Sequence, residues 1–152
     1  MLQLKFNIKG LDRLAAKLDA MDRAAHNLQP ALQKVGEWVQ RGVNTGFVNQ
    51  ATPDGIGWLA LKPETVYRRA QMGFGAGPIL RRTGALADSI RLVTHPHSVA
   101  VGTDLDYGAA HQTGYAHAMS GKRVPSRKFL GLPPAGLDGA ASILIKHLRQ
   151  TL

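Results

Sequence analysis

Three segments between Pro78 and Leu132 decide the architecture of this chain: PILRRTGALADSI at 78–90, VAVGTDLDYGAAHQTG at 99–114 and VPSRKFLGL at 124–132. They hold few of the side chains that catalysis requires. They are rich instead in glycine and proline, which fix the backbone, and in arginine and lysine. This composition predicts a component that is built into a larger assembly, and it argues against a catalyst.

The same stretch predicts short elements joined by tight turns. Thr83 is placed to cap a short helix. Apolar residues at 90–94 and 99–102 predict two antiparallel strands around a His-Pro-His-Ser turn. Residues 107–112 suit a helical turn that ends at a glycine. The small, polar and basic segment 114–123 is expected to be a mobile loop.

The N-terminal third is expected to be mainly helical. Residues 2–8 alternate between apolar and polar side chains, which predicts a half-buried strand. Apolar residues at helical spacing over 11–28 then predict an amphipathic helix. Pro30 interrupts the pattern, because proline lacks a donor N–H and clashes with the preceding turn. The helical stripe resumes from Leu32 to Phe47, so we expect two consecutive helices or one kinked helix.

The remaining segments are short. Residues 49–57 form a turn-rich loop, and Trp58 and Leu59 are predicted to anchor it on the core. Proline and glutamate at 63–64 are typical of a helix start, here for a helix to about Gln71. A C-terminal helix is expected after Pro134.

Together these elements predict one α+β domain over residues 1–152. Its small, mostly antiparallel sheet is packed against helices, with a long helical N-terminal part and a C-terminal helix. A chain of 152 residues is long enough to bury a core without disulfides or metal, and it contains no cysteine.

The charge balance indicates the kind of partner. The chain carries 19 basic and 10 acidic residues, a formal net charge of +9. Such an excess favours nucleic acid or an anionic protein surface. No apolar run approaches the length of a signal-peptide core or a membrane helix. We therefore expect no membrane partner, and a chain that is made in a cytoplasm and used there or in a particle assembled there.

Candidate metal ligands gather in one region, but their context favours turns. The histidines are His95, His97, His111 and His117. The proline between the first two indicates a turn instead of a metal-binding pair on a strand. A nuclease-like cluster of Asp88, Asp104, Asp106 and His111 is conceivable. However, a Gly-Thr-Asp sequence after a strand is typical of turn chemistry.

Other catalytic patterns are weak. No nucleophile elbow surrounds Ser89 or Ser98, and the only glutamates are Glu37 and Glu64. The glycine run at 73–77 lacks the Gly-Lys-Ser/Thr ending of a phosphate-binding loop. We therefore expect no enzyme activity, no catalytic residues, no cofactor and no metal site.

Four basic pairs remain to be explained. They are Arg68-Arg69, Arg81-Arg82, Lys122-Arg123 and Arg127-Lys128. No helix-turn-helix, zinc finger or aromatic stacking motif accompanies them. Three readings stay open: a solvated basic face, contact with an acidic protein, or non-specific contact with DNA phosphates.

An ordered set of short motifs extends through the central and C-terminal parts. The set comprises Trp58 and Leu61 after a Pro-Asp-Gly loop, Ile79-Leu80, Thr83-Gly84-Ala85-Leu86, Ser89-Ile90, Val101-Gly102, Tyr107, His111-Gln112-x-Gly114 and Val124-Pro125-x-Arg127-x-Phe129-Leu130-Gly131. On these residues the chain resembles the phage virion morphogenesis family, which includes tail completion proteins of tailed phages. The resemblance covers roughly Phe47 to Leu132.

The resemblance implies a structural virion protein without catalysis. Such a protein acts at the head–tail neck, in tail completion or head–tail joining, as a closed ring of subunits. We expect a hexamer, with a dodecamer as the alternative, in contact with neighbouring neck or tail proteins and with DNA that passes without sequence readout. The rival prediction is a basic protein that binds DNA non-specifically.

Cyclic symmetry requires two different complementary surfaces on each subunit. We predict that one surface includes the loop 114–128 and that the other involves the helical N-terminal part. Phe129 and Leu130 should anchor the extended segment before them and leave Arg127 and Lys128 free to face a neighbour. Reversing the charges of Arg123 and Arg127 is then expected to block assembly while the monomer stays folded. The candidate interface residues are Arg81, Arg82, Lys122, Arg123, Arg127 and Lys128.

Overall fold

The computed structural model describes residues 11–117 and 121–150, and for residues 11–14 the backbone alone. The helices are α1 (Leu11–His26), α2 (Gln29–Asn49), α3 (Pro63–Gln71), α4 (Ala85–Asp88), α5 (Tyr107–Thr113) and α6 (Gly136–Arg149). The strands are β1 (Arg91–His95), β2 (Ser98–Gly102), β3 (Tyr115–Ala116) and β4 (Arg123–Val124). The strand expected at 2–8 lies outside the described residues.

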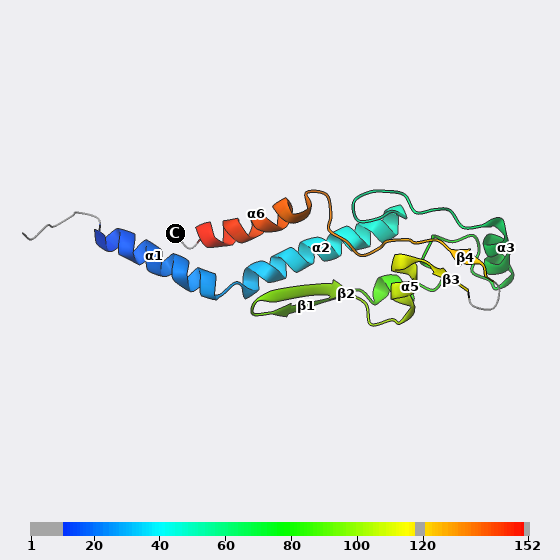
Figure 1. Ribbon diagram of the computed structural model, residues 1–152, viewed down its shortest axis with the longest axis horizontal. Coiled ribbons are helices and arrows are strands. Elements are labelled where there is room, and N and C mark those ends of the chain that lie inside the picture. The colour runs from blue at the N-terminus through cyan, green and yellow to red at the C-terminus, as the bar shows by residue number, and fades with distance from the viewer. Residues whose placement is uncertain (1–10, 118–120, 151–152) are drawn as a thin grey trace, which may run out of the picture.

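Helix α2 is the central element of an elongated molecule (Figure 1). The β1–β2 hairpin lies along one side of it and α6 along the other, while α1 extends beyond one end. The predicted break is confirmed, because α1 ends at His26 and Pro30 occupies the first turn of α2. Proline is tolerated there, where its missing N–H has no intrahelical partner to lose.

The β1–β2 hairpin confirms the predicted antiparallel pair with a shift of one residue at the strand ends. Its register runs from Arg91 opposite Gly102 to His95 opposite Ser98. Side chains alternate along both strands, so that the half-buried ones, Leu92 and Val99 among them, face one side.

Close packing of the hairpin on α2 depends on Gly36. A Cβ atom at this position would lie 2.6 Å from Cγ2 of Val99 and even nearer to Cδ1 of Leu92. The glycine therefore permits a helix–sheet approach that any larger residue obstructs.

The largest hydrophobic cluster lies at the far end of α2. Its buried members are Val43, Phe47, Trp58, Ile79, Leu86, Ile90 and Phe129. The Phe47 ring contacts the edge of Trp58 and also Phe129, each at a centroid distance of 5.6 Å. Trp58 also donates its indole N–H to the Lys128 carbonyl at 2.9 Å. This cluster joins three distant segments of the chain and supports the adjoining loops.

The α+β class is confirmed, with differences in detail. The described residues form two separate two-stranded antiparallel sheets. Part of the loop expected at 114–123 is paired, because β3 forms a short ladder with β4. The N-cap of α4 is Gly84 at φ 87°, and Thr83 one residue earlier accepts the Ala85 N–H at 3.4 Å. Leu59 is 65% exposed, so the prediction that it anchors the loop was wrong, whereas Trp58 is buried.

Within the described part of the chain, no helix has both the length and the apolar character needed to span a membrane.

Candidate interaction groove

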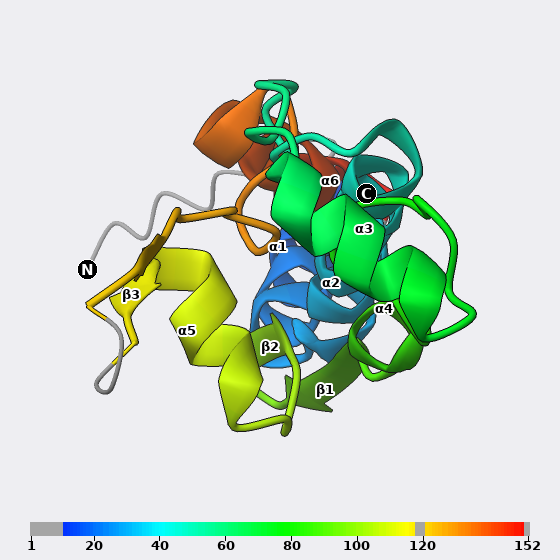
Figure 2. The same cartoon turned by 90° about the vertical axis from the view of Figure 1, so that its right-hand side faces the viewer.

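A wide groove of about 1600 Å³ opens at the end of the molecule that holds the hydrophobic cluster. Helix α3 and the chain segments before and after it form one wall, and α5 with β3 and β4 forms the other. Figure 2 looks at this end, with α3 and α4 on one side and α5 and β3 on the other. We call this feature the basic groove.

Positive charge dominates the lining of the basic groove. Its cationic residues are Lys62, Arg68, Arg69, Arg82, Lys122, Arg123 and Arg127. The histidines His111 and His117 also line the groove. Glu64 is the single acidic residue among the described lining residues. Its carboxylate lies 3.4 Å from Lys122 Nζ, and both side chains are more than two-thirds exposed, so this ion pair is weak. One carboxylate offsets only one of the seven cationic side chains. The groove thus suits an anionic ligand or surface.

Apolar side chains share the lining. Exposed members include Leu59, Met72, Tyr107 and Tyr115. Near the rim, the guanidinium of Arg82 stacks over the Phe74 ring at 5.4 Å. Such a mixture offers contacts to a partner that combines carboxylates with apolar groups.

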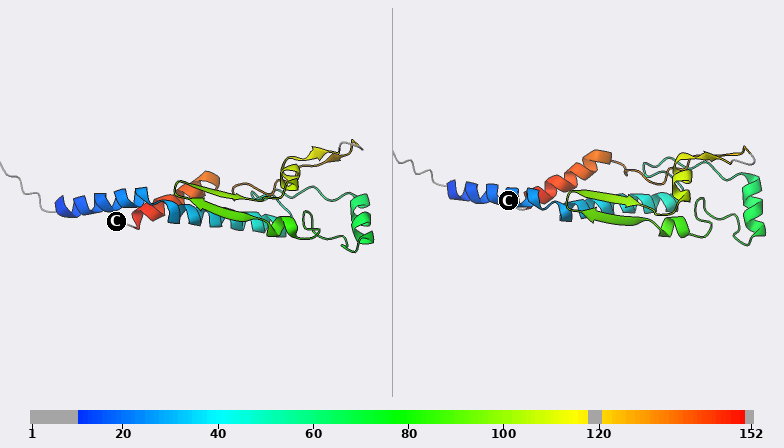
Figure 3. Two further views of the ribbon diagram at one scale, coloured as in Figure 1. Left: turned by 90° about the horizontal axis from the view of Figure 1, so that it is seen from below. Right: turned by 60° about the horizontal axis from the view of Figure 1, so that its bottom comes forward.

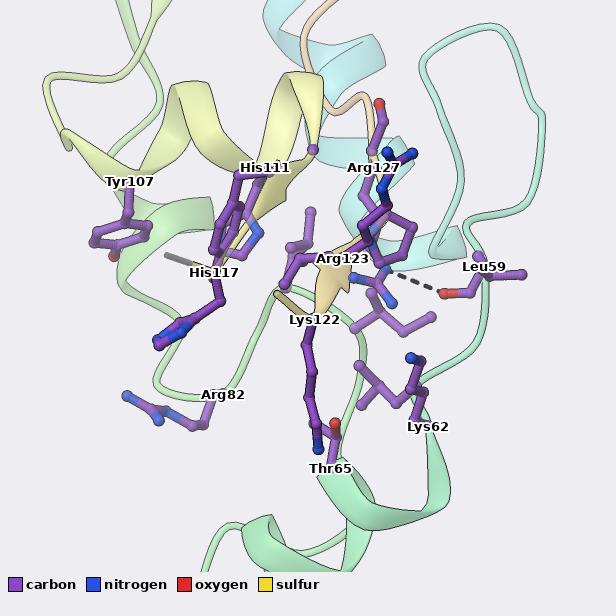
Figure 4. Close-up of a pocket in the computed structure, with 18 of the residues that line it drawn as sticks. Leu59, Lys62, Thr65, Arg82, Tyr107, His111, His117, Lys122, Arg123 and Arg127 are labelled. Atoms are coloured by element: carbon purple, nitrogen blue, oxygen red, sulfur yellow. Dashed lines mark hydrogen bonds between the residues drawn. The ribbon is translucent and has the colours of Figure 1, made fainter. Parts of the chain in front are cut away.

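Arg127 lines the basic groove and is only 6% exposed. Its Nε donates to the Leu59 carbonyl at 3.1 Å (Figure 4). Its Nη2 donates to the Ala60 carbonyl at 3.4 Å. Its backbone N–H donates to the His111 carbonyl at 2.8 Å. The expectation that Arg127 is free to face a neighbour was therefore wrong, because its guanidinium ties two loops together.

Burial of Arg127 has an electrostatic consequence. Desolvation first, and the charge of Arg69 second, lower the pKa of Arg127. An arginine nevertheless stays protonated at neutral pH, because its unperturbed pKa is so high. Its neutral carbonyl partners do not cancel that charge, which therefore adds to the positive potential of the groove.

The segment that carries Arg127 is held by Gln112. The Gln112 side-chain oxygen accepts the N–H groups of Phe129 at 3.0 Å and Leu130 at 3.1 Å, and its Nε2 donates to the Leu130 carbonyl at 2.8 Å. Ser126 donates its hydroxyl to the Gln112 carbonyl at 2.7 Å. The sequence motif included this glutamine, but its role as a clamp becomes visible only in three dimensions.

Close approach at Gly114 completes the clamp. A Cβ atom on Gly114, whose φ is 76°, would lie 2.7 Å from the Ser126 nitrogen. Glycine tolerates both the positive φ and the contact. Buried Phe129 confirms the predicted anchor of this segment.

His111 lines the groove beside Arg127. Its ring contacts Tyr107 edge-on at 6.0 Å, and its buried Nδ1 has no hydrogen-bond partner among the described residues. Burial, and secondarily the charge of Arg127, lower the pKa of His111 below 6.5. The imidazole is therefore neutral at pH 7 and does not act as a fixed cation.

The groove gathers four of the six residues predicted as interface candidates. Arg82, Lys122, Arg123 and Arg127 line it, while Arg81 and Lys128 are exposed outside its lining. Figure 4 shows the four lining residues around one space. Sequence reasoning had not placed Lys62, Arg68 and Arg69 at this site. The Arg68-Arg69 pair was visible, but its position opposite β4 depends on tertiary packing.

The other candidate chemistry is scattered. Among residues 11–117 and 121–150, no three histidine, aspartate or glutamate side chains come together as a metal site. Asp104 lies 3.9 Å from Arg91 in an exposed pair. The Ser89 hydroxyl contacts Thr103 Oγ1 at 2.6 Å and donates to the Leu86 carbonyl.

Comparison with known proteins gives one family. The model of the phage virion morphogenesis family matches residues 7–149. Searches of curated proteins and of solved structures give no match.

Proposed function

Because the chain belongs to the phage virion morphogenesis family, we propose that it is a non-catalytic component of the head–tail neck. In this proposal it completes the tail or joins it to the head as a closed ring of subunits, a hexamer or alternatively a dodecamer. Family membership makes it a phage structural or assembly protein. The observation that carries the finer proposal is the basic groove, a charged contact surface on a rigid support.

The hydrogen bonds at the groove support a role in contact instead of catalysis. The side chains of Gln112 and Arg127 form hydrogen bonds with backbone groups. These bonds therefore fix the shape of the groove wall. The exposed cations Lys122 and Arg123 lie on that wall and do not hold the backbone in place. A charged face of this kind selects an anionic partner and sets its orientation.

We propose that the groove receives an acidic surface of an adjoining neck or tail protein. Charge reversal with Lys122→Glu and Arg123→Glu in one chain should then prevent the assembly of complete particles. Both side chains are exposed, and the Lys122–Glu64 pair is solvent-screened, so the monomer should keep its stability. The measurement is the yield of infectious particles, together with thermal unfolding of the purified variant.

The matched control is Lys34→Glu with Arg149→Glu, which changes the net charge equally at exposed positions of α2 and α6 outside the groove lining. Particles should assemble normally with this control. Normal particle yield from the groove variant would reject the groove as an assembly contact. If infectious particles form in normal yield when the chain is not produced at all, the neck function itself is rejected.

The seven cations of the groove also favour the second candidate, non-specific DNA binding. That function predicts duplex binding whose affinity falls steeply, by orders of magnitude, between about 50 and 200 mM salt. It also predicts that the Lys122/Arg123 variant binds DNA more weakly with a shallower salt dependence. If the purified chain does not bind DNA at low salt, this candidate fails.

A further inference from the structure

Helix α1 is covered on only one side. It extends beyond the rest of the molecule in every side view (Figures 1 and 3) and packs against α6. The buried Ala24 and half-buried Ala20 lie on the same side of α1. At the adjoining helix junction, His147 Nε2 of α6 lies 3.1 Å from the Asn27 carbonyl oxygen. The other side chains described on α1, at residues 15–19, 21–23, 25 and 26, are exposed.

The apolar stripe of α1 lies to one side of this contact. Leu18 is 57% exposed, Met21 is 39% exposed, and Ala25 is exposed as well. At about 100° per residue these three side chains fall within a sector of ~60°, and Ala24 lies roughly 100° from its centre. An amphipathic helix normally buries such a stripe. Here α6 covers the alanine side instead.

Opposite charges flank the stripe. Lys17 lies on one side of it and Asp22 on the other, and both are exposed. With Leu18 and Ala25 at heptad position a and Met21 at d, Lys17 takes position g and Asp22 takes position e. The Asp22 carboxylate also has His26 Nδ1 at 3.5 Å, on the next turn of the same helix.

We propose that α1 packs in parallel against α1 of a neighbouring copy of this chain, with Lys17 of one copy beside Asp22 of the next. A parallel arrangement brings g and e positions of opposite charge together. An antiparallel arrangement would bring g positions beside g positions and e positions beside e positions, so that Lys17 and Asp22 of different copies could not pair. The proposal rests on the ring proposed above and names one of its contacts.

Charge balance makes a second copy the fitting occupant. The chain as a whole carries +9, so most of its surfaces repel an identical copy. Residues 15–26 of α1 hold two cations, Lys17 and Arg23, and two anions, Asp19 and Asp22. The stripe can therefore approach the same stripe of another copy without strong charge repulsion. Two basic grooves that approached each other would repel.

The direction also agrees with cyclic symmetry. Rotation about an axis along the helices relates neighbouring copies in parallel. Each α1 then presents its Lys17 flank to one neighbour and its Asp22 flank to the other. These are the two different surfaces that a closed ring requires.

The absence of cysteine from the sequence allows a direct test. A chain with both Lys17→Cys and Asp22→Cys is treated with a short bismaleimide, as purified protein and in assembled particles. We expect a ladder of covalent oligomers on a denaturing gel. Mixed single-cysteine chains, Lys17→Cys with Asp22→Cys, should give dimers, and each single variant alone should give none.

Three outcomes would overturn this contact. Dimers from Lys17→Cys alone would mean antiparallel packing. Crosslinks only to another virion protein would assign α1 to a different partner. No ladder, even in assembled particles, would mean that the copies meet elsewhere, and the neck function would survive, since its own test is particle assembly.

Substitutions provide an independent readout in sedimentation of the purified chain. Leu18→Glu should abolish self-association, and Lys17→Glu should weaken it several-fold. Adding Asp22→Lys to Lys17→Glu should restore it, since the charges are exchanged and not removed. Ala16→Glu, which is exposed on the opposite side of α1, is the control that should leave self-association unchanged. Failure of the exchange to restore association would contradict the Lys17–Asp22 pairing.

Discussion

At the scale of single residues, Gln112 shows how one side chain shapes the groove wall. It satisfies two backbone N–H groups and one carbonyl of residues that follow it by 17 and 18 positions. Backbone groups that lose their partners away from water are costly. The segment before Phe129 is extended because valine precedes proline at 124–125, and it therefore has no helix of its own to satisfy its donors.

Replacing Gln112 with alanine should therefore destabilise the fold. We expect a loss of about 2 kcal/mol in the free energy of unfolding, because the Phe129 and Leu130 amides lose their acceptor. Urea unfolding measures this loss. Thr113→Ala is the neighbouring control, since the Thr113 hydroxyl is exposed and bonds within its own turn. Equal effects of the two substitutions would contradict the clamp.

His111 predicts a dependence on pH. Its pKa is lowered in the folded protein, so the unfolded chain binds the proton more readily. The stabilisation is complete above an unfolded pKa near 6.5 and is lost as pH falls towards the lower folded value. The melting temperature of the wild-type chain should fall more between pH 7.5 and 5 than that of His111→Gln. Parallel pH profiles of the two proteins would count against this assignment.

At the scale of elements, the β1–β2 hairpin and α2 form one unit through Gly36. The strands were predictable because two short runs rich in apolar and β-branched residues flank a His-Pro-His-Ser turn. The contact was not, because a glycine within a helical stripe looks like a gap in the pattern. Only the position of Leu92 and Val99 across from it explains why a small residue stands there.

Gly36→Ala should accordingly destabilise the protein although alanine favours helices. Overpacking costs about 1–3 kcal/mol and helix propensity returns up to ~1 kcal/mol, so a net loss is expected. In a Leu92→Ala background the same substitution should cost less, since the nearer obstacle is gone. Thermal or urea unfolding of the four proteins gives the coupling, and strictly additive effects would refute it.

At the scale of the whole molecule, local signals determined the elements and long-range contacts determined the site. Pro30, Pro63 and Gly114 marked element ends that the structure confirms. The burial of Arg127 had no such signal, because its partners are carbonyl oxygens of Leu59 and Ala60, 68 and 67 positions away. Every residue carries a carbonyl, so no sequence pattern identifies which ones an arginine will reach.

The straight course of α2 has a mechanical consequence. Its 21 residues span about 30 Å at 1.5 Å per residue, with the exposed stripe of α1 beyond one end and the basic groove beyond the other. In the proposed assembly the chain would therefore act as a spacer of fixed thickness. Binding at one of the two proposed contacts could then alter the geometry of the other only by bending α2, which is packed against α6 on one side and the β1–β2 hairpin on the other. In a stack of such subunits, the distance between the two proposed contacts would thus stay the same whatever is bound at either contact.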